Sequence, residues 1–238
     1  MKGFEMKFNI EKYIFPKGLY CVVCGKYIDD KRKYGLCDHC IRRMNFGCSE
    51  FDCSPYFDYG FAAMGYGLYE RRLIFNLKYD AKTYMAPIIA DIIYDAIYEQ
   101  VSMRGGCPLL DADFIVPVPL HEKRLRERGF NQTAKISKHL GNKLAIPADE
   151  DVLIRNKETH TQRALSREDR KLNMENVFKV SAHKVNKVKN SKIIILDDIY
   201  TTGATANSCA KTLKESGAKK IYVLTLLFAG NRHHLMVK

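Results

Sequence analysis

The chain has no long apolar segment and is short of acidic residues relative to basic ones. None of its hydrophobic runs approaches the roughly 18 residues of a membrane-spanning helix, which excludes insertion into a bilayer. Residues 1–15 lack the apolar centre of a secretory signal, so we expect a cytoplasmic protein. The net charge of +12 at pH 7 favours anionic partners, phosphorylated metabolites or nucleic acid. A solvated basic surface would explain the same charge.

Internal repeats and low-complexity linkers are also absent, and after about residue 60 apolar runs alternate with helical patterns. Apolar residues recur at helical spacing in 85–101, whereas 192–196 is an apolar run bounded by charge, as in a central parallel strand. This alternation predicts an α/β fold with an open, mostly parallel sheet. We assign this domain to residues 59–238 and a separate module to residues 1–58. We expect strands at 61–69, 114–120, 151–154, 192–196 and 221–228, helices at 71–79, 85–101, 131–144 and 205–216, and a polar loop at 156–171.

Most of the cysteines are concentrated near the N-terminus. Disulfides are rare in the reducing cytoplasm, so paired cysteines there indicate metal binding. Two CxxC pairs separated by twelve residues provide the four sulfurs of a tetrahedral Zn²⁺ site: Cys21, Cys24, Cys37 and Cys40. Gly25 and Gly35 supply the backbone freedom that such turns need. The segment has little apolar core of its own, so the metal should supply most of its folding energy.

Other sulfur and imidazole groups do not fit this pattern. Cys48 and Cys53 have a CxxxxC spacing, and His39 lies inside the second pair, where it competes as a ligand. We assign structural roles to all three. Cys107 and Cys209 stand alone and are expected to be buried or partly buried.

Residues 193–205 (IIILDDIYTTGAT) join an apolar strand, two carboxylates, a hydroxyl-rich turn and a helix start. Ligands of an open α/β sheet bind at the carboxyl ends of strands, and a helix N-terminus offers N–H groups to a phosphate. Two aspartates beside a phosphate make sense if they accept hydrogen bonds from ribose hydroxyls. An acidic turn, or a magnesium site of another α/β family, is the alternative. The predicted ribose 5-phosphate ligands are Asp197, Asp198, Thr201, Thr202, Gly203, Ala204 and Thr205.

A second candidate segment is the basic stretch 117–132 (PVPLHEKRLRERGFNQ), which leaves a strand and enters a helix. If the strands are parallel, it lies at the same sheet edge. Arg124 and Arg128 would then pair with phosphoryl oxygens, while Gly129 and Asn131 bring backbone donors to the helix start. The alternative is a solvated helix face with Arg–Glu pairs, which applies most to Arg126.

Residues 193–205 resemble the motif with which type I phosphoribosyltransferases bind 5-phosphoribosyl-1-pyrophosphate (PRPP). Tyr200 departs from it, because that family usually has an aliphatic residue there. The order of motifs resembles the ComF family (ComFC type) of competence-associated proteins over about residues 18–230: the CxxC pairs, RLIFNLKY (72–79), PVPL, RGFNQ, TQRALSR (161–167) and DDIYTTGAT. The resemblance implies a zinc-ribbon-like module before a type I phosphoribosyltransferase-like domain. It also implies a flexible catalytic loop with Gln162, Arg167 and Arg170 as candidate residues.

The resemblance further implies phosphoribosyl transfer from PRPP with release of Mg²⁺-pyrophosphate. This reaction needs positioning and charge stabilisation more than a protein nucleophile, and Mg²⁺ would be held largely by substrate oxygens. We take Arg128, Asp197 and Asp198 as candidate catalytic residues. No segment resembles a glutaminase domain, so glutamine amidotransferase activity is not expected. The alternative is a non-catalytic module of the DNA-uptake machinery that binds PRPP, nucleotide or single-stranded DNA.

Overall fold

The protein is built on a five-stranded sheet. The computed structural model describes residues 19–29, 31–51, 54–79, 82–155 and 177–230. The strands of the main sheet are β1 (Ser49–Phe51), β2 (Tyr59–Gly65), β3 (Phe114–Pro117), β6 (Lys192–Tyr200) and β7 (Lys220–Phe228). Their order is β1-β2-β7-β6-β3, and every pair is parallel except β1–β2. The predicted open, mostly parallel α/β sheet is confirmed.

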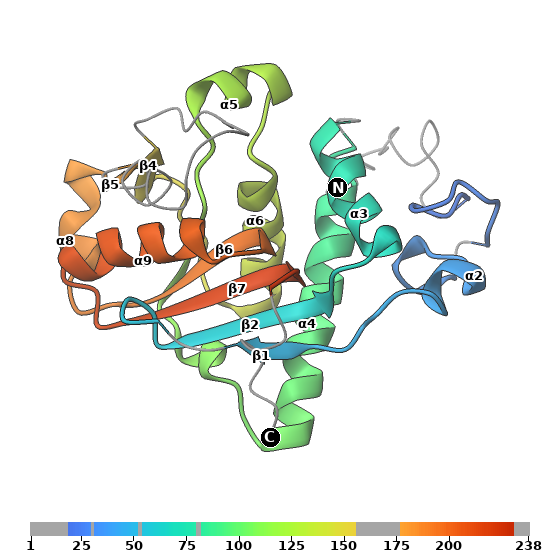
Figure 1. Cartoon of the computed structure of the whole chain (residues 1–238), viewed down its shortest axis with the longest axis horizontal. Coiled ribbons are helices and arrows are strands. Elements are labelled where there is room, and N and C mark those ends of the chain that lie inside the picture. The colour runs from blue at the N-terminus through green and yellow to red at the C-terminus, as the bar shows by residue number, and fades with distance from the viewer. Residues whose placement is uncertain (1–18, 30, 52–53, 80–81, 156–176, 231–238) are drawn as a thin grey trace, which may run out of the picture.

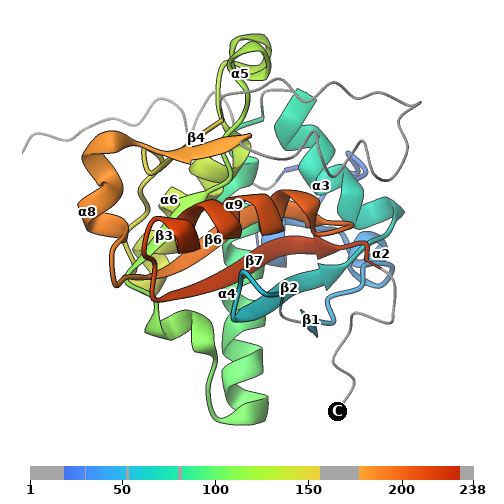
Figure 2. The same ribbon diagram turned by 60° about the vertical axis from the view of Figure 1, so that its left-hand side comes forward.

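Helices cover both faces of this sheet (Figure 1), as the turned view in Figure 2 also shows. On one face lie α3 (Leu68–Tyr79), α4 (Met85–Arg104) and α6 (Gln132–Leu144). On the other lie α9 (Ala204–Glu215) and a small sheet of β4 (Leu153–Arg155) and β5 (Phe178–Val180). The short helices are η1 (Lys33–Gly35), α2 (Asp38–Ile41), η2 (Pro108–Asp111), α5 (Glu122–Arg128), η3 (Ala182–Lys184) and α8 (Val185–Val188).

Strand β6 is apolar without alternation because both of its faces are buried. Ile193 and Ile195 pack into the core that contains α9, and Ile194 and Leu196 pack into the core that contains α4 and α6. A strand between two helical layers has no solvent-facing side, so a continuous apolar run is the expected pattern. The apolar run at 192–196 thus identified the central strand correctly.

The other predicted elements are present with small shifts of their ends. The strand expected at 151–154 is β4, and the helix expected at 71–79 begins three residues earlier, at Leu68. Two strand ends differ by four residues: β6 continues beyond its predicted end to Tyr200, and the strand expected at 61–69 is β2, which ends at Gly65 because the chain turns into α3 at Leu68. The loop expected at 156–171 lies outside the described residues.

The N-terminal module, residues 19–47, shares a core with the main domain. Leu36 and Met44 are buried in the same cluster as Leu73 of α3 and Ile89 of α4. Apolar burial against α3 and α4 therefore stabilises this segment as well, and the share of its folding energy that the metal supplies remains a prediction. Strand β1 precedes the predicted boundary between residues 58 and 59 and pairs with β2 after it. The division into two domains remains a prediction. Among the described helices, none is long and apolar enough to cross a membrane.

Glycine is required at one position in β2, where the Phe51 ring lies over Gly60. These residues are partners in the β1–β2 register, and a methyl group on Gly60 would overlap the ring. The ring has little room to move, because it is fully buried and its centroid lies 4.2 Å from that of Tyr200 and 5.5 Å from that of Phe228.

We predict that Gly60→Ala lowers the free energy of unfolding by about 1–3 kcal/mol through overpacking. Urea denaturation monitored by circular dichroism measures this change. Gly106→Ala is the matched control, because nothing lies within 4 Å of the added methyl group. Equal stabilities for the two variants would contradict the packing of Phe51 on Gly60.

Candidate functional site

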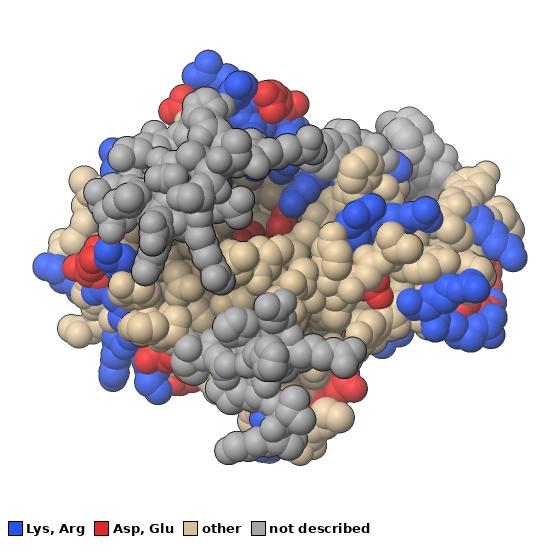
Figure 3. Space-filling view, viewed as in Figure 1, with Lys and Arg blue, Asp and Glu red and all other residues tan. Residues whose placement is uncertain are grey.

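The two segments singled out in the sequence meet at one edge of the sheet. Strands β3 and β6 are parallel, with Pro117 opposite Leu196, so the residues that follow both strands emerge on the same side. Strand β7 runs parallel to β6 and contributes a third carboxyl end there. The predicted juxtaposition of residues 117–132 with residues 197–205 is therefore confirmed. Figure 3 shows this face hollowed between the α5 and α3 regions, with acidic and basic side chains in the hollow.

Asp197 and Asp198 lie inside β6 rather than after it. The strand continues because β7 pairs with it as far as Tyr200, which lies opposite Phe228. The Tyr200 and Phe228 rings are stacked with centroids 5.7 Å apart, and Tyr200 is buried. Aromatic packing thus holds this part of the chain extended. In an extended strand, neighbouring side chains point to opposite faces, which separates the two carboxylates.

Asp198 is the centre of a polar network on the α3–α6 side of the sheet. Its Oδ2 forms an ion pair with Lys78 Nζ of α3 and accepts a hydrogen bond from Gln132 Nε2 of α6 at 3.1 Å. Gln132 Oε1 accepts a hydrogen bond from Arg128 Nη1, also at 3.1 Å. Asp198 is only 7% exposed, so these partners offset the cost of burying its charge.

Asp197 has a different electrostatic environment. Burial, and then the charge of Asp198, raise the pKa of Asp197 to about 7, although the backbone N–H of Asp198 donates to its Oδ1 at 2.8 Å. Lys78 and Arg155 act in the opposite direction. Burial, and then the charge of Arg124, lower the pKa of Arg155 itself. The folded protein thus makes Asp197 easier to protonate than a free aspartate.

The hydroxyl-rich turn leads directly into α9. Thr201 and Thr202 are exposed, and Gly203 adopts a left-handed conformation with φ of 75° just before the helix starts at Ala204. A side chain on Gly203 would collide with the Tyr200 hydroxyl group. Tyr200, the departure from the family pattern, thus packs under the turn. The Ala204 N–H has only a long hydrogen bond, 3.4 Å, to Thr202 Oγ1.

The basic segment is partly helical, because residues Glu122–Arg128 form α5. Gly129, with φ of 77°, ends this helix, and the Asn131 side chain accepts a hydrogen bond from the Thr133 N–H as the cap of α6. Arg126 pairs with Glu122 on an exposed surface, as in the alternative given above. Arg128 instead joins the network of Asp198 through Gln132.

Three residues of this region were not identified from the sequence: Lys78, Gln132 and Arg155. Lys78 and Gln132 occur in the motifs RLIFNLKY and RGFNQ, but their spacing carries no sign that both converge on Asp198. Lys78 and Gln132 lie 120 and 66 positions before Asp198 in the sequence, so no local sequence pattern can predict these contacts. The predicted loop residues Gln162, Arg167 and Arg170 lie outside the described residues.

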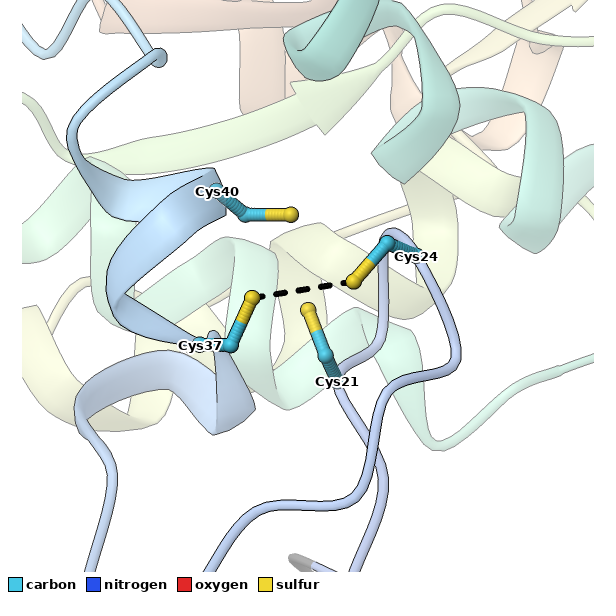
Figure 4. Close-up of side chains that lie close together, drawn as sticks. All are labelled: Cys21, Cys24, Cys37 and Cys40. Atoms are coloured by element: carbon cyan, nitrogen blue, oxygen red, sulfur yellow. Dashed lines mark hydrogen bonds between the residues drawn. The ribbon is translucent and has the colours of Figure 1, made fainter.

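The four CxxC cysteines form a metal-binding cluster, shown in Figure 4. The sulfur atoms of Cys21, Cys24, Cys37 and Cys40 all lie within 4.8 Å of one another, and those of Cys24 and Cys37 are 3.6 Å apart. Gly25 and Gly35 have φ of 74° and 61°, as the turns require. The cluster can therefore hold a metal ion.

The thiol pKa values also indicate that this cluster suits a cation. Backbone hydrogen bonds outweigh the effect of burial and lower the pKa of Cys21 to about 7. Burial and the neighbouring sulfurs raise the pKa of Cys40. Four thiols this close cannot all ionise unless a cation balances their charge, which a divalent metal provides.

Three of the other sulfur groups and His39 can be placed in the described part of the chain, outside the cluster. His39 is within hydrogen-bonding distance of Arg43, and Cys48 donates a weak hydrogen bond to Gln100 Oε1 at 3.8 Å. Cys107 and Cys209 are buried, as predicted. Cys53 lies outside the described residues.

Comparison with known proteins agrees with this architecture. Residues 125–236 match the family model of the phosphoribosyl transferase domain. Competence protein F of Haemophilus influenzae is 32% identical over 151 residues, which cover 63% of this chain and 64% of that protein. The chain is a homologue of competence protein F. The resemblance to the ComF family is thus confirmed.

A second relative of this group is DNA utilization protein YhgH of Escherichia coli, 31% identical over 154 residues, 65% of each chain. The match to both relatives covers slightly less than two thirds of their own length. A solved purine phosphoribosyltransferase from Pyrococcus horikoshii is 18% identical, with a TM-score of 0.33, over 59% of this chain and 73% of that one.

The phosphoribosyl transferase match begins within α5 and extends past β7. It includes Arg128, Gln132 and residues 197–205, but not α3, which supplies Lys78. The metal cluster likewise precedes it. Several elements that precede the match therefore contact it: β2 and β3 pair with its strands, and Lys78 of α3 reaches Asp198.

We predict that Asp197→Asn is more stable than the wild type at pH 8 by roughly 1–3 kcal/mol, because the folded protein raises the pKa of Asp197 from 3.8 to about 7. A raised carboxyl pKa means that the folded state binds the proton more tightly. The stability contributed by Asp197 is therefore complete below pH 3.8 and lost as the pH rises through 7. Urea unfolding between about pH 4 and pH 8 measures the difference.

The matched control for this prediction is Asp151→Asn, which removes an exposed carboxylate. Its difference from the wild type should not change over the same pH range. A stability difference for Asp197→Asn that is equally independent of pH would contradict the raised pKa.

Proposed function

We propose that this chain binds PRPP together with Mg²⁺ at the carboxyl edge of its sheet and transfers the phosphoribosyl group to an acceptor. The observation that carries this proposal is the arrangement of residues 197–205. Two carboxylates stand at the end of a central parallel strand and are followed at once by a hydroxyl turn and a helix N-terminus. This arrangement offers acceptors for sugar hydroxyls next to donors for a phosphate.

The 5-phosphate is assigned to the turn and the start of α9. Thr201 and Thr202 are exposed hydroxyl donors, and Gly203 keeps side-chain bulk away from the backbone. The N–H groups at Ala204 and Thr205 belong to the first turn of α9, where helix geometry leaves them without partners inside the helix. The partial positive charge of the helix N-terminus adds to the attraction.

The ribose hydroxyls are assigned to Asp197 and Asp198, and the pyrophosphate to Arg124, Arg128 and the backbone at Gly129. The bond between the anomeric carbon and the pyrophosphate oxygen breaks while the acceptor nucleophile bonds to that carbon. The cationic side chains then stabilise the charge that collects on the leaving group. By family resemblance, Gln162, Arg167 and Arg170 contribute a loop that covers the reacting groups.

When bound, Mg²⁺ draws negative charge from the pyrophosphate and makes it a better leaving group. We assign the cysteine cluster to Zn²⁺, since four thiolates suit that ion and complete its tetrahedral shell. Cysteines that bind a metal rather than form disulfides are typical of a reducing compartment, which supports placement in the cytoplasm. We extend to this chain the role in DNA uptake that the name of competence protein F implies.

A second candidate function is the binding of single-stranded DNA without catalysis. One observation favours it. Tyr20 and Tyr27 belong to the N-terminal module (residues 19–47), called the metal module below because it holds the cysteine cluster. They are 63% and 67% exposed, with ring centroids 6.0 Å apart. Lys26 lies beside this pair in the sequence, and exposed rings next to basic residues can stack with bases.

We predict that isothermal titration detects binding of PRPP with Mg²⁺ and that Asp197→Ala with Asp198→Ala weakens it at least about 100-fold, since two charged hydrogen bonds are lost. The direction of the change in PRPP affinity shows whether the carboxylates bind the ligand or repel it. If the carboxylates only repel the ligand, their removal strengthens binding. Glu150→Ala with Asp151→Ala is the matched control, because it removes two adjacent exposed carboxylates from the same domain.

Release of pyrophosphate from PRPP across a panel of bases, amines and nucleotides separates the two candidate functions. Release that the double substitution abolishes supports the transferase. Salt-sensitive binding of single-stranded DNA that survives the substitution, without any release, supports the second function. Tighter PRPP binding by the Asp197→Ala, Asp198→Ala protein would refute the assignment of the ribose.

We predict one zinc ion per chain in protein purified under reducing conditions, measured by elemental analysis. Cys37→Ser should lose the metal because it removes one of four ligands. Cys48→Ser is the matched control and should retain it, since Cys48 lies outside the cluster. A metal content near zero in unoxidised wild-type protein would contradict this assignment.

A further inference from the structure

Helix α3 brings a positive charge to the candidate ribose site. Lys78, near its C-terminal end, forms an ion pair with Asp198 Oδ2. The two side chains are only 19% and 10% exposed, so the pair is largely shielded from water. Shielded charges interact much more strongly than exposed ones. Lys78 precedes the phosphoribosyl transferase match at residues 125–236 and has no role in the proposed function so far.

Several contacts fix the position of α3, and with it the position of Lys78. Leu73, Ile74 and Leu77 of this helix are buried in the core. On the side of the metal module, Asn76 Nδ2 donates to the Val22 carbonyl oxygen at 2.6 Å, and Glu70 Oε1 accepts a hydrogen bond from the Asn45 N–H. The ammonium group is thus presented to Asp198 by a helix that is anchored along its length.

The contacts of Asp198 are unevenly shared between its two oxygens. Lys78 and Gln132 both bind Oδ2. Within the described part of the chain, no hydrogen bond to Oδ1 is present. A carboxylate held in this way has a fixed orientation and keeps one oxygen for a further donor, such as a hydroxyl group.

We infer that Lys78 is a positioning residue of the ribose site, which orients the Asp198 carboxylate through Oδ2 so that Oδ1 accepts a ligand hydroxyl. The inference rests on the proposed function, because the hydroxyl group belongs to the phosphoribosyl ligand. It extends the site to a helix outside the matched domain.

The ammonium group also acts on the neighbouring carboxyl group. Asp197 is faced by Asp198 of its own strand, Lys78 of α3, Arg155 of β4 and Cys209 of α9. Burial and Asp198 raise the pKa of Asp197, whereas Lys78 and Arg155 lower it. Removal of the Lys78 charge therefore makes Asp197 harder to ionise. The pH dependence of ligand binding should then differ between the wild type and a variant without this charge.

The test compares Lys78→Met, Lys78→Gln and Lys78→Arg by titration with PRPP and Mg²⁺ from about pH 5.5 to 8.5. We expect a loss of affinity of about 10- to 100-fold for Met and Gln, since a charged contact to the accepting carboxylate is removed. Arg should restore most of it. Lys143→Met is the matched control, because it breaks an exposed lysine–aspartate pair with Asp91 on other helices.

A purely structural role for Lys78 would leave the pH profile unchanged. The positioning role predicts that the midpoint of binding against pH moves to higher pH in Lys78→Met. Lys78→Gln keeps a hydrogen-bond donor and serves if the Met variant fails to fold. Wild-type affinity with an unchanged midpoint in Met or Gln would overturn the inference.

Failure of this inference can be distinguished from failure of the proposed function. If the wild type does not bind PRPP, the proposed function fails. The effect of Lys78 is then measured by carbon-detected NMR titration of the aspartate side chains without ligand. A higher midpoint for Asp197 in Lys78→Met supports the electrostatic part of the inference, and an unchanged midpoint refutes it.

Discussion

Parallel pairing of β3, β6 and β7 is the constraint on which the rest of the structure depends. It directs three carboxyl ends to the same edge of the sheet, so residues that are far apart in the sequence emerge together. In the observed register, both apolar faces of β6 are buried between the two helical layers, and the strand pairs with β3 on one side and β7 on the other. The position of residues 197–205 follows from that register.

The extension of β6 beyond its apolar run gives the two carboxylates different surroundings. Asp198 is oriented by Lys78 and Gln132 on one side of the sheet. Asp197 faces Arg155 and Cys209 on the other side, and burial raises its pKa. Asp197 is thus harder to ionise than a free aspartate, whereas Asp198 is held by an ion pair and a hydrogen bond. Such a pair can accept two hydroxyl groups while limiting the repulsion of a phosphorylated ligand.

The metal module contributes more than a bound ion to this arrangement. It buries Leu36 and Met44 against α3 and α4 and hydrogen-bonds to α3 through Val22 and Asn45. The same helix carries Lys78 to Asp198. The module therefore supports a helix whose far end reaches the candidate site.

Much of this structure could be predicted from local sequence patterns. Two CxxC pairs identify the sulfur cluster, the apolar run at 192–196 identifies the central strand, and the hydroxyl turn before α9 marks the candidate phosphate site. These features depend on residues close together in the chain.

Other features depend on distant partners and could not be predicted in the same way. Strand β6 continues to Tyr200 because β7 pairs with it and because Phe51 and Phe228 pack on that ring. Lys78 and Gln132 reach Asp198 only in the folded chain. The shared core of the metal module likewise arises from α3 and α4, which follow it in the sequence.

The most direct test of the central claim is the location of the bound ligand. Backbone amide chemical shifts, recorded by NMR before and after addition of PRPP and Mg²⁺, report which residues the ligand contacts. If the ligand binds at the carboxyl edge of the sheet, the largest shifts fall at Gly203, Ala204 and Thr205, with further shifts at Asp197, Asp198 and Gly129. Shifts confined to the metal module or to the opposite, amino-terminal edge of the sheet would contradict it.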